Sequence, residues 1–164
     1  MHKFITGRDI DMGLFRILVE QAPDAIIFAD PEGIIRVWNA RATEVFGYGA
    51  SEALGNSVEI IIPHDLRKQH WRGFHEAILQ HHTKSGTRAL ATRALRKSGE
   101  KMYVELAFSI VLDESARAIG AMAIARDVTQ NYFAAKAALN AEAELHSNGS
   151  VETPGARNVA KLCG

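Results

Sequence analysis

Residues 102–110 alternate between large apolar side chains and smaller or polar ones, a pattern typical of a β-strand with one face on a core. Its apolar members are Met102, Val104, Leu106, Phe108 and Ile110. Two more strand-like runs flank it at 87–96 and 118–128, and short turn-forming segments separate the three. Short connections of this kind join neighbouring antiparallel strands. The second half of the chain therefore predicts an antiparallel sheet that needs a cover on one side only.

The rest of the chain predicts a β-hairpin and several helices. Helical spacing of apolar residues predicts a helix at 8–21, and two apolar runs around a glycine turn predict a β-hairpin at 24–38. Further helices are predicted at 39–46 with Asn39 as N-cap, for one turn from Ser51, from Asp65 to about 82, and at 130–145 after Thr129. The predicted elements are five strands and several helices, so the expected fold class is α+β.

At 164 residues the chain has room for one domain with short extensions. The predicted divisions are an N-terminal extension and helix at 1–21, the domain at 22–129, a C-terminal helix at 130–146 and a flexible tail at 147–164. We expect no second core.

The charges of the chain balance, because 19 Lys and Arg residues face 19 Asp and Glu residues. Nucleic acids and acidic membranes attract positively charged proteins. Because this chain has no net charge, we expect neither a nucleic acid nor a membrane as its partner. The single cysteine, Cys163, excludes an intramolecular disulfide and a cysteine-based zinc site. No apolar run approaches the roughly 20 residues of a membrane span, and we expect a cytoplasmic protein.

Leu66, His70, Phe74 and Ile78 recur every four residues in the helix predicted from Asp65, so we expect them to line one stripe of it. His70 is the polar member of this stripe. A neutral imidazole held among apolar walls is a good axial ligand for haem iron. The same spacing also fits a half-exposed helix residue, or a core histidine with a hydrogen-bond partner, and it does not choose between them.

Four landmarks in the sequence resemble those of PAS sensor domains, in the right order. They are Trp38-Asn39-x-x-Ala42-x-x-x-Phe46-Gly47-Tyr48, Glu52-Ala-Leu-Gly55, Arg96-Lys-Ser-Gly99 and Arg126-Asp-Val-Thr129. The resemblance covers about residues 20–130. It implies a five-stranded antiparallel sheet with helices on one face, flanking terminal helices, and a pocket for a cofactor or ligand. The PAS fold by itself does not fix a function.

Residues 63–70 resemble the haem-ligating helix of two groups of PAS proteins, the oxygen sensors that control nitrogen fixation and the direct oxygen-sensor phosphodiesterases. The resemblance implies b-type haem with His70 as the iron ligand. Leu106 and Phe108 match the apolar positions that face the gas ligand in those sensors. Leu90 stands where they carry an oxygen-stabilising arginine, so this chain departs from them at that position.

Other residues could complete such a pocket. Arg88 and Thr92 share the side of Leu90 by period two and are alternative donors to a gas ligand, or solvated sheet-edge residues. Small side chains of the last strand, with Ala123 at their centre, would leave space for a flat cofactor. His81, His82 and Lys84 could meet haem carboxylates, although they could equally be solvated; these residues are candidates only.

We therefore expect a sensor that binds haem and reports a diatomic gas or redox state. It would act as a homodimer through its terminal helices and signal to a partner protein in trans. One alternative is a haem enzyme acting on a small apolar substrate, although no general acid or base is evident. Others are a flavin redox sensor holding FAD near Trp38 and a cofactor-free dimerisation module.

Overall fold

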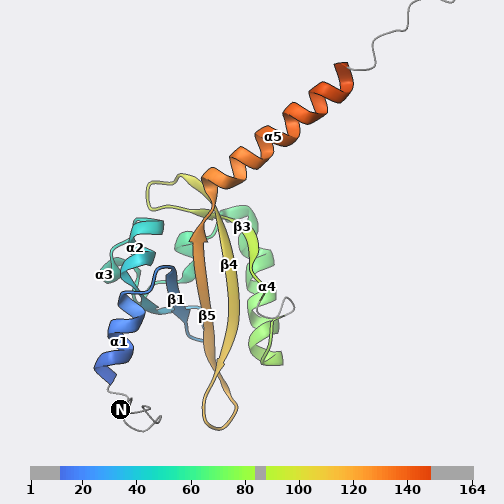
Figure 1. The fold of residues 1–164 in the computed structure, drawn as a ribbon. Coiled ribbons are helices and arrows are strands. Elements are labelled where there is room, and N and C mark those ends of the chain that lie inside the picture. The colour runs from blue at the N-terminus through green and yellow to red at the C-terminus, as the bar shows by residue number, and fades with distance from the viewer. Residues whose placement is uncertain (1–11, 84–87, 149–164) are drawn as a thin grey trace, which may run out of the picture. The chain divides into compact units, whose positions relative to one another are not determined.

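A five-stranded antiparallel sheet forms the centre of the computed structural model, which describes residues 12–83 and 88–148 (Figure 1). The strand order is β2-β1-β5-β4-β3. The strands are β1 (Ala25–Ala29), β2 (Ile35–Trp38), β3 (Leu90–Leu95), β4 (Lys101–Leu112) and β5 (Ala118–Asp127). The predicted α+β class with five antiparallel strands is confirmed.

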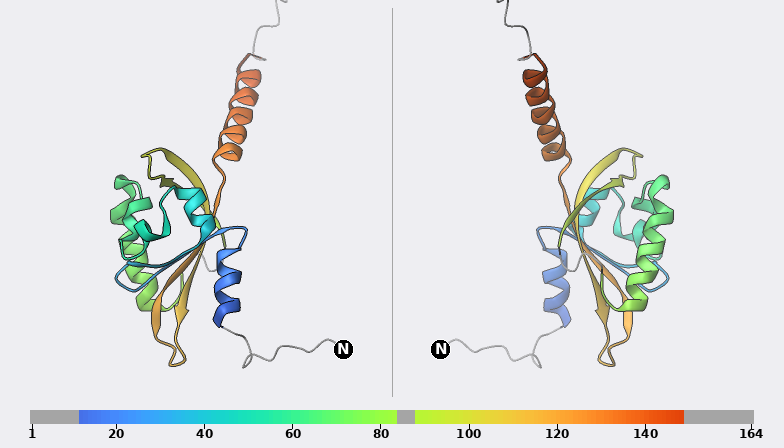
Figure 2. Two further views of the ribbon diagram at one scale, coloured as in Figure 1. Left: turned by 90° about the vertical axis from the view of Figure 1, so that its left-hand side faces the viewer. Right: turned by 90° about the vertical axis from the view of Figure 1, so that its right-hand side faces the viewer.

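Helices cover one face of this sheet. They are α2 (Ala40–Phe46), α3 (Ala50–Ala53), the 3₁₀ turn η1 (Val58–Ile61) and α4 (His64–Gln80). The N-terminal helix α1 (Met12–Glu20) lies on the opposite side of the sheet (Figure 2). The sheet is therefore buried on the side of α4, where the core residues gather.

The chain divides into two compact units after Thr129. The second unit holds the rest of α5 (Thr129–Asn148), an almost entirely exposed helix. Residues 1–11 of the predicted N-terminal extension and residues 149–164 of the predicted tail lie outside the described residues. Across the described ranges, no helix has the length and apolar character needed to cross a membrane.

The strand register puts the predicted apolar residues on one face. Leu106 of β4 pairs with Leu90 on one side and with Ala125 on the other, and Phe108 pairs with Ala123. Directly paired residues point to the same face of a sheet. On the face of the sheet toward α4, small alanines of β5 therefore lie opposite larger side chains of β4.

Asn39 is almost fully buried between α1, β1 and α2 and makes four hydrogen bonds with its side chain. Its Oδ1 accepts from the backbone N–H of Ala42, which caps α2 as predicted, and from that of Ile26 in β1, both at 2.9 Å. Its Nδ2 donates to the carbonyls of Val19 at 2.9 Å and Asp24 at 3.1 Å. One amide therefore joins three elements.

Three predicted helix starts differ from the structure. Thr129 is the first residue of α5 rather than its cap. The other two differences lie in α3 and α4. Ser51 is not the cap of α3, because the helix starts after Gly49, whose N–H donates to the Glu52 carboxylate at 2.9 Å. α4 starts after Pro63 rather than Asp65. Asp65 instead lies in the first turn, where its carboxylate pairs with Arg93 of β3 at 2.6 Å. In both cases an acidic side chain inside the first turn makes the stabilising contact.

Replacing Asn39 by Ala should lower the free energy of unfolding by about 1.5–5 kcal/mol. Loss of a helix N-cap costs roughly 0.5–2 kcal/mol, and leaving a partly buried backbone N–H, here that of Ile26, without its partner costs about 1–3 kcal/mol. Urea unfolding measures the difference. Asn56→Ala is the matched control, because Asn56 is exposed and its side chain makes one hydrogen bond, to Glu52, so its loss should cost about 1 kcal/mol or less. Equal losses in the two variants would contradict the role given to Asn39.

Candidate functional site

A cavity of about 590 Å³ lies between α4 and the inner face of the sheet. Ligand pockets in proteins usually measure about 300–1,000 Å³. The apolar residues that the strands contribute to its lining are Ile27, Leu90, Ala94, Val104, Leu106, Phe108, Ile110, Ala121 and Ala123. Phe46 of α2 and three residues near η1, Val58, Ile61 and Ile62, close one end. The interior of the cavity is therefore mainly apolar.

Polar side chains follow the α4 side of the cavity. Gln69, Arg72, Glu76 and Gln80 of α4 line it, together with His82 and Thr83 just after the helix. Most of them are exposed. The cavity thus has an apolar interior and a polar margin along α4. Of the three residues considered for contact with carboxylates, His82 lies in the lining, His81 lies outside it, and Lys84 is outside the described residues.

His70 is the histidine that α4 itself contributes to the lining. Its ring stacks on Phe74 with a centroid distance of 5.9 Å and meets the ring of Trp71 edge-on at 5.3 Å. Its Nδ1 atom is buried and has no hydrogen-bond partner in the structure described. Buried polar atoms are almost always paired, so this atom calls for an explanation.

The surroundings of His70 keep its imidazole neutral. Burial lowers the pKa of His70 below its ordinary value, the Glu59 carboxylate opposes this shift, and the nearby His75 adds to it. Burial has the largest effect because removing an imidazolium from water is costly. At neutral pH the ring therefore keeps a nitrogen lone pair free to bind a metal ion.

Six of the eight residues predicted for the site line the cavity: His70, Phe74, Leu90, Leu106, Phe108 and Ala123. Leu90 is at the beginning of β3 and 49% exposed, so it lies at the edge of the cavity rather than inside it. Thr92 also lines the cavity, whereas Arg88 is exposed and lies outside the lining. Of the two alternative donors, the structure brings only Thr92 to the site.

Ile78, predicted for the same stripe as His70, lies outside the lining. A step of four residues turns about 40° beyond a full helical turn, so three such steps rotate Ile78 about 120° away from Leu66. Gly73 and Ala77 of α4 lie in the lining instead. Alternating steps of three and four residues describe the face of α4 better than steps of four.

Trp38, the other predicted residue outside the lining, is 3% exposed and belongs to the core. Its Nε1–H donates to the Thr43 hydroxyl and to the Tyr48 carbonyl, both at 3.1 Å. Its ring packs at 5.6 Å from that of Phe46, which does line the cavity. Sequence reasoning did not assign Phe46 to the site, although its position at the apolar end of α2 was a usable signal.

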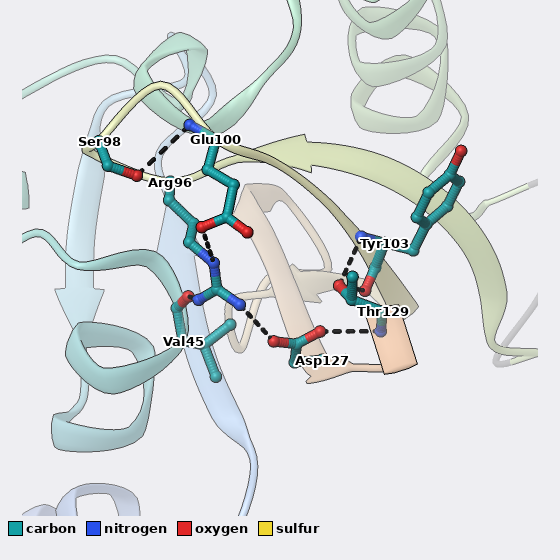
Figure 3. Close-up of polar contacts among 7 residues, drawn as sticks. All are labelled: Val45, Arg96, Ser98, Glu100, Tyr103, Asp127 and Thr129. Carbon is teal, nitrogen blue, oxygen red and sulfur yellow. Dashed lines mark hydrogen bonds and ion pairs between the residues drawn. The ribbon is translucent and has the colours of Figure 1, made fainter. Parts of the chain in front are cut away.

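A polar network joins α2, the β3–β4 turn and the end of β5 (Figure 3). The Arg96 guanidinium donates to the Val45 carbonyl and pairs with the Asp127 carboxylate at 2.6 Å. Asp127 also accepts the N–H of Thr129 at 2.9 Å. Burial alone would raise the pKa of Asp127, but the hydrogen bonds from Thr129 and the ion pair with Arg96 lower it overall. This arrangement holds the first residue of α5 to the sheet.

Within residues 12–83 and 88–148, no three His, Cys, Asp or Glu side chains come together as a metal-binding group. A metal ion held at this cavity by protein side chains alone would therefore lack a ligand set. A metal that brings its own ligands, and needs one imidazole from the protein, has no such requirement.

Comparison with known proteins identifies the class. A family model of the PAS fold matches residues 13–128, and the chain therefore belongs to the PAS family. The sensor protein FixL of Bradyrhizobium diazoefficiens is 36% identical to it over 55 residues, which are 34% of this chain and 11% of FixL. The chain thus matches only about a tenth of the length of this relative.

Solved structures share the fold. A PAS domain from Colwellia psychrerythraea superposes with a TM-score of 0.63 at 24% identity, over 73% of this chain and 99% of that one. An RNA-binding Light-Oxygen-Voltage receptor gives a TM-score of 0.66 at 18% identity, over 92% of this chain and 42% of the receptor. At these identities the likeness shows the architecture and leaves the ligand to be argued from the cavity.

Proposed function

We propose that this PAS domain binds b-type haem in the cavity through His70 and signals a diatomic gas or redox state to a partner protein. The observation that carries the proposal is that His70 lines an apolar cavity and that its buried Nδ1 has no hydrogen-bond partner among the described residues. The resemblance of residues 63–70 to the haem-ligating helix of PAS oxygen sensors adds to it. The proposal extends the PAS assignment, which leaves the ligand open.

The residues present fit such a group. His70 would supply the axial ligand, Phe74, Leu106 and Phe108 would contact the porphyrin faces, and Ala123 leaves room beside them. Haem, when bound, supplies an iron atom with a free coordination position for a small gas. The task of the chain is to keep His70 neutral, exclude water and hold the group in one orientation. Burial of His70 and the apolar lining serve the first two tasks.

A flavin fits the lining less well. The edge of a flavin ring carries several hydrogen-bonding groups that need partners when they are buried. On the sheet side of the cavity, the polar residues of the described lining are Thr92 and Arg93, and Arg93 is already paired with Asp65. The sheet side of the lining therefore favours a cofactor whose edge on that side carries few hydrogen-bonding groups.

His70→Ala should weaken haemin binding sharply and remove the absorption bands of histidine-ligated iron, because the variant lacks the imidazole in the cavity wall. Titration of the ligand-free protein with haemin, followed by absorption spectroscopy, measures both effects. His64→Ala is the control, since His64 is exposed on the first turn of the same helix and lies outside the lining. Unchanged haemin affinity and spectrum in His70→Ala would rule out the proposed ligand.

Thr92 adds a hydroxyl to the sheet wall of the cavity. An oxygen ligand held there would gain from a hydrogen-bond donor in this wall, whereas carbon monoxide would gain little. The Thr92 hydroxyl is one such donor, and Leu90 at the edge of the cavity offers none. A neutral hydroxyl donor stabilises less than an arginine would, so the affinity for oxygen relative to carbon monoxide should be low.

Two variants of the haem-loaded protein test this wall in opposite directions. Thr92→Val should lower oxygen affinity about 2- to 12-fold, which corresponds to the roughly 0.5–1.5 kcal/mol of a neutral hydrogen bond at about 1.4 kcal/mol per decade. Leu90→Arg should raise it about ten- to a hundredfold, since a charged donor contributes roughly 1.5–3 kcal/mol. Stopped-flow oxygen dissociation rates measure both changes. Rates equal to those of the unmodified protein in both variants would contradict the account of the sheet wall.

The proposed signalling unit is a homodimer formed through the terminal helices. Helix α1 contributes no buried residue, and four of its large apolar side chains are about half exposed or more: Met12, Phe15, Ile17 and Leu18. In α5, Leu139 is 66% exposed. A short amphipathic helix such as α1 is marginally stable alone and requires a surface that covers its apolar stripe. In the proposed dimer, the apolar stripe of one copy packs against the same stripe of a second copy, so that each stripe is covered.

Phe15→Glu and Leu18→Glu should each weaken this dimer at least tenfold, which corresponds to about 1.4 kcal/mol, because each places a charge in an apolar contact. Sedimentation velocity over a concentration series measures the dissociation constant. Arg16→Gln, on the same helix, is the control and should leave it within about twofold. A monomeric unmodified protein, or dimers equally stable in all four proteins, would contradict the proposed interface.

A further inference from the structure

Trp71, the residue after His70, lies directly on the turn between β1 and β2. A Cβ atom added to Gly33 in this turn would come within 2.2 Å of the indole ring, far closer than any real contact. Gly33 also has a φ of 79°, which favours glycine. The absence of a side chain at Gly33 therefore lets the indole pack on the turn itself.

The polar atom of the same indole is fixed by Glu59 of η1. The Nε1–H of Trp71 donates to Glu59 Oε1 at 2.5 Å. The other carboxylate oxygen accepts from Arg67 Nη1 at 3.1 Å, and Arg67 also donates to the Glu59 carbonyl at 3.2 Å. One carboxylate thus holds α4 at positions 67 and 71, on both sides of His70.

The turn that contains Gly33 and the 3₁₀ turn η1 are hydrogen-bonded to each other. The N–H of Val58 donates to the Gly33 carbonyl at 3.0 Å, and the N–H of Glu59 donates to the Ser57 hydroxyl at 3.2 Å. Trp71 therefore contacts two segments, the turn and η1, that are already bonded to each other. The ring of Trp71 in turn meets the ring of His70 edge-on at 5.3 Å.

We infer that Gly33, Glu59, Arg67 and Trp71 form a clamp that fixes the direction in which α4 presents His70 to the cavity, with Glu59 and Trp71 as positioning residues. The inference rests on the proposed function. A ligating histidine must be held within about 0.5 Å and 10–20° of its productive geometry, and contacts behind the ligand provide this restraint. The clamp supplies it through the side chains of Arg67 and Trp71, which lie on α4 on both sides of His70.

Amide hydrogen exchange of the ligand-free protein tests the clamp without any cofactor. Trp71→Phe removes the Nε1–H donor and should speed the exchange of α4 amides around His70 about tenfold, and Glu59→Ala should do the same. Trp38→Phe is the matched control, because Trp38 also donates through Nε1, but to Thr43 and Tyr48 rather than to Glu59, which also binds Arg67 of α4. It should leave α4 unchanged. Unchanged α4 exchange in Trp71→Phe would overturn the clamp.

The positioning role is read from the ratio of haemin affinity to metal-free protoporphyrin IX affinity. Both probes share the porphyrin contacts, so the ratio isolates the bond between iron and His70. Trp71→Phe and Glu59→Ala should lower it about tenfold. Trp38→Phe should leave it within about twofold, as should Glu59→Gln, which keeps an oxygen acceptor for Trp71.

The outcomes separate the two proposals. A ratio near one in the unmodified protein would overturn haem ligation by His70, and the exchange experiment alone would then decide the clamp. A high ratio that Trp71→Phe and Glu59→Ala do not change would leave haem ligation intact and overturn the positioning role.

Discussion

The buried side chain of Asn39 is the interaction on which the cavity end of the domain depends. Its four hydrogen bonds connect the end of α1, the start of β1 and the first turn of α2. Two walls of the cavity follow from these elements, since β1 carries Ile27 and α2 carries Phe46. A buried amide that satisfies four backbone groups sets one arrangement of these elements, because every other arrangement leaves a polar group unpaired.

The cavity wall contains a buried polar group, the imidazole of His70, whose hydrogen bonding contrasts with that of Asn39. The structure satisfies Asn39 completely, but Nδ1 of His70, a residue of the cavity wall, has no hydrogen-bond partner among residues 12–83 and 88–148. Glu59 and Trp71 anchor the helix that carries His70. An unpaired buried nitrogen costs free energy that a bound ligand can recover. The proposed function and the clamp both follow from this contrast, because a ligand that depends on one imidazole requires that imidazole to be neutral and rigidly held.

Much of the fold could be predicted from the sequence because it rests on local signals: the period-two pattern of β4, the Asn39 cap and the glycine turns. Six of the eight residues proposed for the site line the cavity, because strand period and helical spacing place them on the faces that meet there. Ile78 was proposed for the site because a strict four-residue spacing ignores the rotation of the helix, and it lies outside the lining. Trp38 was proposed from its resemblance to the Trp-Asn of flavin-binding PAS domains, but its indole N–H is satisfied inside the core. The clamp was not foreseen, since the contact between Gly33 and Trp71 joins residues far apart in sequence.

The absorption spectrum and iron content of the protein purified from cells supplied with a haem precursor test the central claim most directly. The account predicts close to one haem per chain and, after reduction with dithionite, the spectrum of ferrous haem with a single histidine ligand. A colourless protein, a flavin spectrum, or haem whose spectrum shows no histidine ligation would contradict it.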